Sequence, residues 1–166
     1  MNKTLIVTLQ LEEGAQQYFN ELRKEYFPAH INFLEAHLTL FHVLPAEEGI
    51  VQETLQQLSK RSSMRLSVTG LVNTGNGVAY KIVSEELLVL HATMQEIFQT
   101  FLVGKDKQRL WPHITIQNKV TAFKAQVLFE KLSTGFTPFH ITATGFSTFL
   151  YDNGPWLHLM DHLFEK

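Results

Sequence analysis

Hydrophobic and polar positions follow a strand period and a helix period in turn along the first part of the chain. Short β-branched apolar runs predict buried strands, and longer segments with apolar residues on one face predict amphipathic helices. The order of the predicted elements is β-α-β-α-β. They are a strand at 4–9, a helix at 15–26 that stops before Pro28, a strand at 37–44, a helix at 50–58 and a strand at 65–71.

A turn sequence, Asn-Thr-Gly-Asn-Gly at 73–77, is followed by a second set of elements in the same order. Ser84 and Thr121 are the predicted N-caps of its two helices, and Gly135 is placed to end the second of them. The predicted elements are strands at 78–83, 113–120 and 139–146 and helices at 87–101 and 122–134.

Three pairs of matching segments relate the two sets. Glu12 matches Glu85 at an offset of 73 residues, His37 matches His113 at 76, and Leu66 matches Ile141 at 75. The similar offsets predict an internal duplication, against the alternative that α+β chains often alternate in this way.

The fold that we expect is a bilobal α+β fold. Two duplicated β-α-β-α-β units, at about 1–72 and 78–146, are expected to place antiparallel sheets around a central cleft. The turn signal Asp-Asn-Gly-Pro predicts an additional C-terminal hairpin at 146–164, with His158 and His162 on the solvent-exposed side of its last strand. We interpret residues 1–166 as one domain.

Composition narrows the class of protein. The hydrophobic fraction of 45% is sufficient for a substantial core, and the net charge of −2 argues against a large phosphate-binding surface. The chain has no cysteine, which excludes a thiolate nucleophile and a Cys-ligated metal. The N-terminal apolar run is too short for a signal peptide and no segment is long enough to span a membrane, so we expect a cytoplasmic protein without a membrane partner.

Four H-x-T triplets occur in the chain, where 8 His and 15 Thr in 166 residues give about 0.7 by chance. In a strand, residues i and i+2 point to the same face, so His and Thr can both contact one ligand, whereas in a helix they diverge. His91 lies in a predicted helix, and His140 has no H-x-T counterpart in the other unit. The pair at His37 and His113 is therefore the candidate site.

Two imidazoles and two hydroxyls fit the chemistry of a phosphodiester. With ordinary pKa values near 6.5, His37 and His113 can act as acid and base near neutral pH, and the hydroxyls of Thr39 and Thr115 can stabilise charge on the phosphate oxygens. Lys119, predicted on the strand face of the second motif, is a candidate phosphate ligand. The implied chemistry is metal-free cleavage or transfer.

Three aromatic residues are weaker candidates for stacking on a base. Phe41 is predicted to share a strand face with His37, while Tyr151 and Trp156 belong to the C-terminal hairpin. The structural alternative for all three is ordinary packing.

At the two motifs, His37-Leu38-Thr39-Leu40 and His113-Ile114-Thr115-Ile116, the chain resembles the two-histidine (2H) phosphoesterase superfamily. Within it, the chain resembles the 2'-5' RNA ligase-like and cyclic phosphodiesterase branch, and Pro112 before the second motif resembles the family as well. The resemblance implies a bilobal fold of two related halves and no metal or other cofactor. It also implies that the partner is a small cyclic nucleotide or an RNA end, with a 2',3'-cyclic phosphate or a 2'-5' linkage.

The resemblance also implies roles for the residues. His113 would activate water or the attacking hydroxyl, His37 would protonate the leaving oxygen, and the two threonines would hold the phosphate. Trp111 and Asn118 depart from the pattern, because RNA ligase-like members often have a basic residue at the first position and an Arg near the second.

Two alternatives to an enzyme of this kind remain. A non-catalytic module that binds a phosphate ester or an RNA end would keep the cleft, but the retention of all four His and Thr positions favours catalysis. A metal site is disfavoured, because His37 and His42 are predicted on opposite faces of a strand and no Asp or Glu accompanies either motif. The sequence leaves the substrate, the direction of the reaction and the oligomeric state open.

Overall fold

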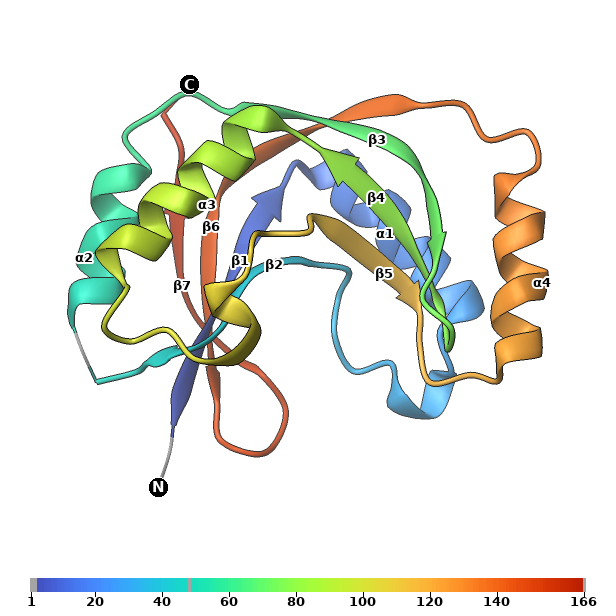
Figure 1. Cartoon of the computed structure of the whole chain (residues 1–166), viewed down its shortest axis with the longest axis horizontal. Helices are drawn as coiled ribbons and strands as arrows, with labels where there is room; N and C mark the ends of the chain where they lie inside the picture. Colours follow the sequence, from blue (N-terminus) through green and yellow to red (C-terminus); the bar gives the residue numbers. More distant parts are fainter. Residues whose placement is uncertain (1–2, 48, 166) are drawn as a thin grey trace.

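The computed structural model describes residues 3–47 and 49–165, and these ranges contain four α-helices and one seven-stranded antiparallel sheet (Figure 1). The predicted α+β class is confirmed, and so is the order β-α-β-α-β in two successive units. The elements are β1 (Thr4–Leu11), α1 (Glu13–Tyr26), β2 (Leu38–Pro45), α2 (Gly49–Leu58), β3 (Met64–Asn73), β4 (Val78–Val83), α3 (Glu85–Ile97), β5 (His113–Gln117), α4 (Ala122–Ser133), β6 (Phe139–Tyr151) and β7 (Leu157–Leu163), with short 3-10 turns at Ala29–Ile31 and Gly104–Lys107.

The strand order is symmetric with respect to the two units. It runs β2-β1-β6-β3-β4-β5. The counterparts in the two units are β1 and β4, β2 and β5, and β3 and β6. Exchanging each strand for its counterpart gives the same order read from the opposite end. At the centre, Leu66 of β3 is paired with Ile141 of β6, and these two residues are the matching positions of the sequence repeat. An approximate two-fold axis therefore passes through this pair, and the strands of both units form one continuous sheet rather than separate ones.

The curvature of the sheet brings its two ends together. β2 and β5 lie at opposite ends of the strand order, yet they contact each other (Figure 1). Each of these strands carries one of the two H-x-T motifs. The fold therefore places the two motifs side by side although 76 residues separate their histidines in the sequence.

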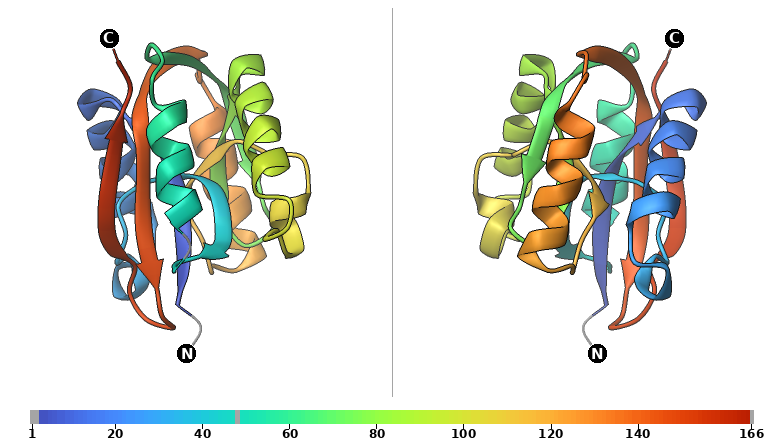
Figure 2. Two further views of the ribbon diagram at one scale, coloured as in Figure 1. Left: turned by 90° about the vertical axis from the view of Figure 1, so that its left-hand side faces the viewer. Right: turned by 90° about the vertical axis from the view of Figure 1, so that its right-hand side faces the viewer.

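The first helix of each unit packs on the other unit. From α1, the side chain of Arg23 donates to the carbonyl oxygen of Thr115 in β5, and from α3, His91 is hydrogen-bonded to the carbonyl oxygen of Leu40 in β2. Figure 2 shows α2 and α3 at one end of the molecule and α4 at the other. As predicted, Ser84 caps α3 and Thr121 caps α4, each accepting a hydrogen bond from the third residue on.

A bulge in β2 changes which residues face the core. Val7 is paired with Phe41 and the next residue, Thr8, with Thr39, so Leu40 is an extra residue in β2. Leu40 and Phe41 are both buried in consequence, whereas His42 is only partly buried. The expectation that Phe41 lies on the strand face of His37 and Thr39 is wrong, because it assumed strict alternation.

The C-terminal hairpin has the predicted position, but β6 runs without a break from the second unit into it. His158 is exposed as expected. His162 is only 8% exposed and is hydrogen-bonded to Gln52, while Leu157, Leu159 and Leu163 are exposed. The prediction of a solvent-exposed His162 is therefore wrong: a register irregularity between β6 and β7 at Thr148/Phe149 interrupts the alternation.

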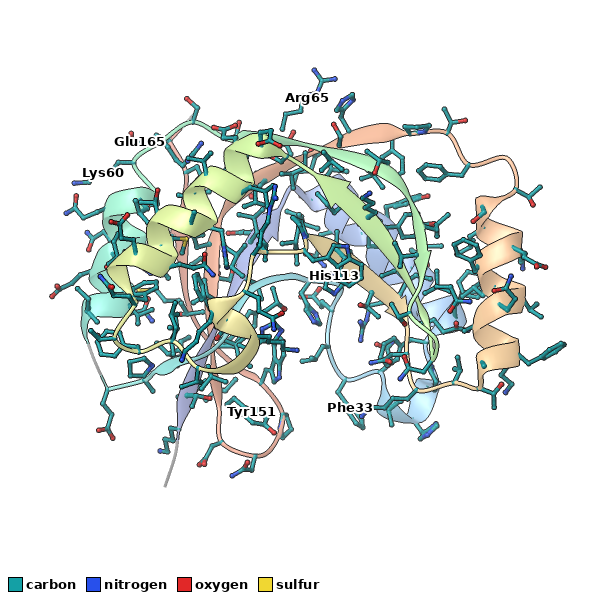
Figure 3. All side chains as sticks on the ribbon, in the orientation of Figure 1. Phe33, Lys60, Arg65, His113, Tyr151 and Glu165 are labelled. Atoms are coloured by element: carbon teal, nitrogen blue, oxygen red, sulfur yellow. The ribbon has the colours of Figure 1, made fainter. Side chains whose placement is uncertain are left out.

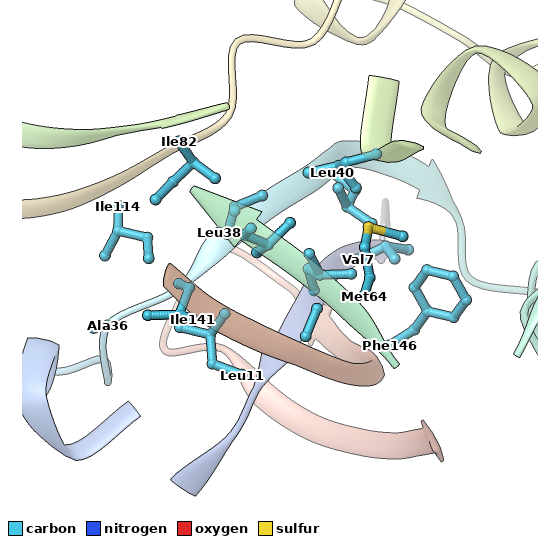
Figure 4. Close-up of a cluster of buried hydrophobic side chains, with 14 of the residues drawn as sticks. Val7, Leu11, Ala36, Leu38, Leu40, Met64, Ile82, Ile114, Ile141 and Phe146 are labelled. Carbon is cyan, nitrogen blue, oxygen red and sulfur yellow. The ribbon is translucent and has the colours of Figure 1, made fainter. Parts of the chain in front are cut away.

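The core lies under the two motif strands. Leu38 and Leu40 of β2 and Ile114 of β5, the aliphatic residues between and beside the motif positions, are buried with Ile82 and Ile141 (Figure 4). Since their neighbours in the strand point the other way, this burial directs Thr39 and Thr115 out of the core.

Candidate active site

His37 and His113 have equivalent positions at the starts of the two motif strands. His37 directly precedes β2, and His113 is the first residue of β5 and lies near the middle of the molecule (Figure 3). The Nδ1 of His37 is 2.8 Å from the carbonyl oxygen of Glu35, and that of His113 is 2.7 Å from the carbonyl oxygen of Trp111. Because a carbonyl only accepts, Nδ1 carries the proton in both rings, and both Nε2 atoms keep a free lone pair.

Each imidazole packs against one of the two tryptophans of the chain. The ring centroids of Trp111 and His113 are 3.8 Å apart with the planes stacked, and those of Trp156 and His37 are 4.9 Å apart with the planes tilted by 51°. The indole rings limit the rotation of both imidazoles and shield them from water.

The pKa values of both histidines are lowered from the ordinary value. Burial lowers the pKa of His37 to about 4, and the charges of Arg23 and His113 lower it further. Burial also lowers the pKa of His113 from its ordinary value, against a raising effect of the bond to Trp111. Both imidazoles are therefore neutral at pH 7 when the site is empty, and each has a basic Nε2.

Two cavities meet at His37 and Trp156. We call the smaller one, of about 540 Å³, the cationic cavity, because Arg23 and Lys119 line it with Thr115 and Asn118, and none of its described lining residues carries a carboxylate. The larger, of about 850 Å³, is the acidic cavity, which is lined by five carboxylates and by neither Lys nor Arg among the described residues. They are Glu12, Glu13, Glu21, Glu35 and Asp161. An anionic ligand is favoured in the cationic cavity.

Comparison with known protein families gives a match over most of the chain. The family described as the 2'-5' RNA ligase superfamily matches residues 11–155, which include both motifs. The chain belongs to this superfamily. Among curated proteins, none matches the sequence at a significant level.

Several solved structures have a similar fold. TT0787 of Thermus thermophilus is 15% identical, with a TM-score of 0.66, and the match covers 96% of this chain and 97% of that one. LigT of E. coli complexed with 3'-AMP is 13% identical with a TM-score of 0.62, and its complex with NADP+ is 15% identical with a TM-score of 0.61, each over 99% of both chains. At these identities the likeness concerns the fold.

The structure of this 2'-5' RNA ligase superfamily member brings some of the weaker candidates to the site. Lys119 follows the end of β5 in a left-handed backbone conformation, with φ of 58°, and still lines the cationic cavity. Trp156 lines both cavities. Tyr151 is on the outer part of the hairpin, is absent from both linings, and is labelled in Figure 3.

Phe41 is not available to a ligand. It is 0% exposed and packs between His91 and Phe98, with ring centroids 4.6 and 5.6 Å away. The expectation that Phe41 could stack on a base is therefore corrected, and the physical reason is the bulge at Leu40.

The other two H-x-T triplets lie elsewhere. His91 is on α3 as predicted and is buried, where its Nε2 is 2.9 Å from the carbonyl oxygen of Leu40. His140 of β6 is exposed and hydrogen-bonded to Arg65, its counterpart in the repeat, because both lie next to the two-fold axis. Neither residue lines the two cavities that meet at His37.

Sequence reasoning missed two residues of the site. Arg23 on α1 reaches the second motif, and nothing in its helical pattern indicated that contact. His42 was expected on the opposite face, but the bulge places it near the site, where its charge lowers the pKa of both His37 and His113. Its own Nδ1 is 3.2 Å from Asp106, a carboxylate on the loop before the second motif.

Neither a metal cluster nor a membrane-spanning helix occurs in residues 3–47 and 49–165. In these ranges the structure has no group of three or more His, Cys, Asp or Glu arranged to hold a metal ion. Within the same ranges, none of the helices has the length and hydropathy needed to cross a membrane.

Proposed function

We propose that this chain is a metal-independent phosphodiesterase that acts on 2',3'-cyclic phosphates or on 2'-5' linked nucleotides and RNA ends. The observation that carries the proposal is the symmetric pair of histidines, each with Nδ1 fixed by a main-chain carbonyl and Nε2 free, followed by a threonine two residues on. One group from each motif, His37 from the first and Thr115 from the second, lines a cavity with cationic side chains, as a phosphate site requires.

The proposed reaction opens the cyclic phosphate by hydrolysis. The oxygen of a water molecule forms a bond to phosphorus while the bond from phosphorus to one ribose oxygen breaks. One imidazole takes the proton from the water, and the other gives a proton to the ribose oxygen. The hydroxyls of Thr39 and Thr115 donate to the non-bridging oxygens, where negative charge is held.

The environments of the two histidines suit a shared proton transfer. Burial lowers the pKa of each imidazole, so either can act as the base in the free protein. The negative charge of a bound phosphate raises the pKa of a neighbouring imidazole, which can then act as the acid. We keep the roles that the family resemblance implied, with His113 as the base and His37 as the acid.

The test is an assay of a 2',3'-cyclic nucleotide and of a 2'-5' linked dinucleotide in the presence of EDTA. We expect His37→Ala and His113→Ala each to lower kcat by at least about 10²-fold, because one proton transfer is lost. The matched control is His140→Ala, which removes the histidine of another strand H-x-T triplet and leaves kcat unchanged. Activity that EDTA abolishes, or that survives both motif substitutions, contradicts the mechanism.

A binding module for phosphate esters or RNA ends is the second candidate, and the cover of both imidazoles by indole rings favours it over an open catalytic site. In that case the wild-type protein binds a 2',3'-cyclic nucleotide in a calorimetric titration and does not convert it. Turnover in the same sample rejects this candidate.

A further inference from the structure

Arg23 is a buried cation in the wall of the proposed phosphate site. It is only 3% exposed, although it lies in the last turn of α1, an amphipathic helix whose other charged residues face solvent. Desolvation lowers its pKa to about 10, so the guanidinium is still charged at neutral pH.

The hydrogen bonds of Arg23 leave its charge uncompensated. Its Nε donates to Oδ1 of Asn32 over 3.1 Å, and its Nη1 donates to the carbonyl oxygen of Thr115 over 3.2 Å. The guanidinium also lies 4.0 Å from the ring centroid of Phe27. These partners are all neutral, and among residues 3–47 and 49–165 Arg23 has no carboxylate within ion-pair distance.

A buried charge without a counter-charge is costly in free energy, and proteins keep one where a ligand supplies the opposite charge. Glu35 lines a small neighbouring cavity with Arg23, but its Oε1 accepts a hydrogen bond from Asn20. On its other side, Arg23 lines the cationic cavity together with His37 and Thr115. The missing counter-charge is therefore expected in this cavity.

The contact with Thr115 places the guanidinium beside the motif threonine. Nη1 of Arg23 donates to the main chain of Thr115, and both residues line the cationic cavity. The charge of Arg23 also acts on His37, whose pKa it lowers. Arg23 thus lies next to one group from each motif, where a bound phosphate would be.

We propose that Arg23 binds the substrate phosphate directly, as the cation that compensates the negative charge held between the two motifs. The inference rests on the proposed function for the identity of the substrate, whereas the anion site itself does not depend on turnover. The guanidinium matches the geometry of phosphate oxygens, and its fixed bonds to Asn32 and Thr115 hold it in place before the ligand arrives.

The alternative is that Arg23 only joins α1 to the edge of β5. Arg23→Met and Arg23→Lys separate the two possibilities. Both substitutions remove the hydrogen bonds to Asn32 and Thr115 in part or in full. Only the lysine keeps the positive charge. The matched control is Arg61→Met, which removes a partly buried arginine that is paired with Glu86 and lies outside the cationic cavity.

The first experiment is a calorimetric titration of each folded variant with inorganic phosphate. We expect Arg23→Met to weaken phosphate binding by at least about tenfold, Arg23→Lys to retain part of the affinity, and Arg61→Met to bind as the wild type does. Thermal unfolding of the same samples shows whether each variant is folded. If Arg23→Met is unfolded, the comparison of Arg23→Lys with the wild type decides between the two possibilities. We then expect Arg23→Lys to bind phosphate at least about threefold more weakly than the wild type does.

Equal phosphate affinity of the folded Arg23 variants and the wild type overturns the inference and leaves a structural role for Arg23. A second readout separates this failure from a failure of the proposed function. If the wild type binds phosphate through Arg23 but cleaves neither cyclic nor 2'-5' linked nucleotides, the proposed function fails and the anion site stands. If it cleaves them and Arg23→Met keeps both kcat and KM, the function stands and the inference fails.

Discussion

The indole ring of Trp111 is stacked on the imidazole ring of His113, and the carbonyl oxygen of the same tryptophan accepts the hydrogen bond from Nδ1 of His113. One residue thereby sets both the orientation of the imidazole and the nitrogen that carries its proton. The side chain contributes the first effect and the main chain the second, so substitution of the side chain separates them.

Substitution of Trp111 by Ala should change the pH dependence of the reaction. Removal of the indole exposes His113 to water, so its pKa rises toward the ordinary value, and the limb of the pH profile that belongs to His113 moves to higher pH. Loss of the fixed ring orientation should lower kcat by roughly tenfold. The pH profiles of kcat/KM for Trp111→Ala and Trp111→Phe check this, and a profile of the Ala variant that equals the wild type contradicts it.

The stability of the fold should fall as the pH is lowered from 6.5 to about 4. The pKa values of His37, His91, His113 and His162 are all lowered in the folded state, mainly by burial. Below pH 6.5 the unfolded chain therefore binds more protons than the folded chain, and the free energy of unfolding decreases until the folded histidines are protonated as well.

Urea unfolding of the wild type at pH 7.5 and at pH 4.5 measures this effect. His37→Gln should show a smaller difference between the two pH values, because one of the depressed histidines is gone. Gln57→Ala, which removes an exposed and non-titrating side chain of α2, is the control and should show the wild-type difference. A stability that is constant over this range refutes the prediction.

The carboxylate of Asp106 should be needed for the stability of the bulged strand. It is 3% exposed and accepts hydrogen bonds from the main-chain N–H groups of His42 and Val43 at 2.8 to 2.9 Å. Asp106→Asn loses the charge and one acceptor oxygen, and should lower the free energy of unfolding by about 1–3 kcal/mol. Chemical denaturation tests this against Asp152→Asn, in the exposed turn between β6 and β7, which should have no effect.

The same Gly→Ala change should have opposite effects at two positions. A Cβ on Gly77 would overlap the carbonyl oxygen of Gln117, whereas a Cβ on Gly14 meets nothing within 4 Å. We expect Gly77→Ala to cost about 3 kcal/mol or more by forcing β5 away, and Gly14→Ala, in the first turn of α1, to stabilise by about 0.5 kcal/mol. Thermal unfolding of both variants checks the sign, and a stable Gly77→Ala protein contradicts the close contact.

The elements that the sequence predicted best are those set by local pattern. The boundaries of β4 and the caps of α3 and α4 depend on hydrophobic period and on one capping side chain, which are readable without tertiary contacts. The bulge at Leu40 was not predictable in this way, because it results from the pairing of β2 with β1. Its consequences for Phe41 and His42 were missed for the same reason.

The sequence by itself determined the duplication and the equivalence of the two H-x-T motifs, because both follow from residue order and strand alternation. Only the tertiary structure decided what surrounds them. The curvature of one shared sheet brings β2 and β5 into contact. The first helix of each unit packs on the other unit, and Arg23 of α1 is therefore hydrogen-bonded to Thr115 of β5. Those contacts join residues far apart in the chain, and their geometry is set by packing and sheet twist rather than by any local pattern.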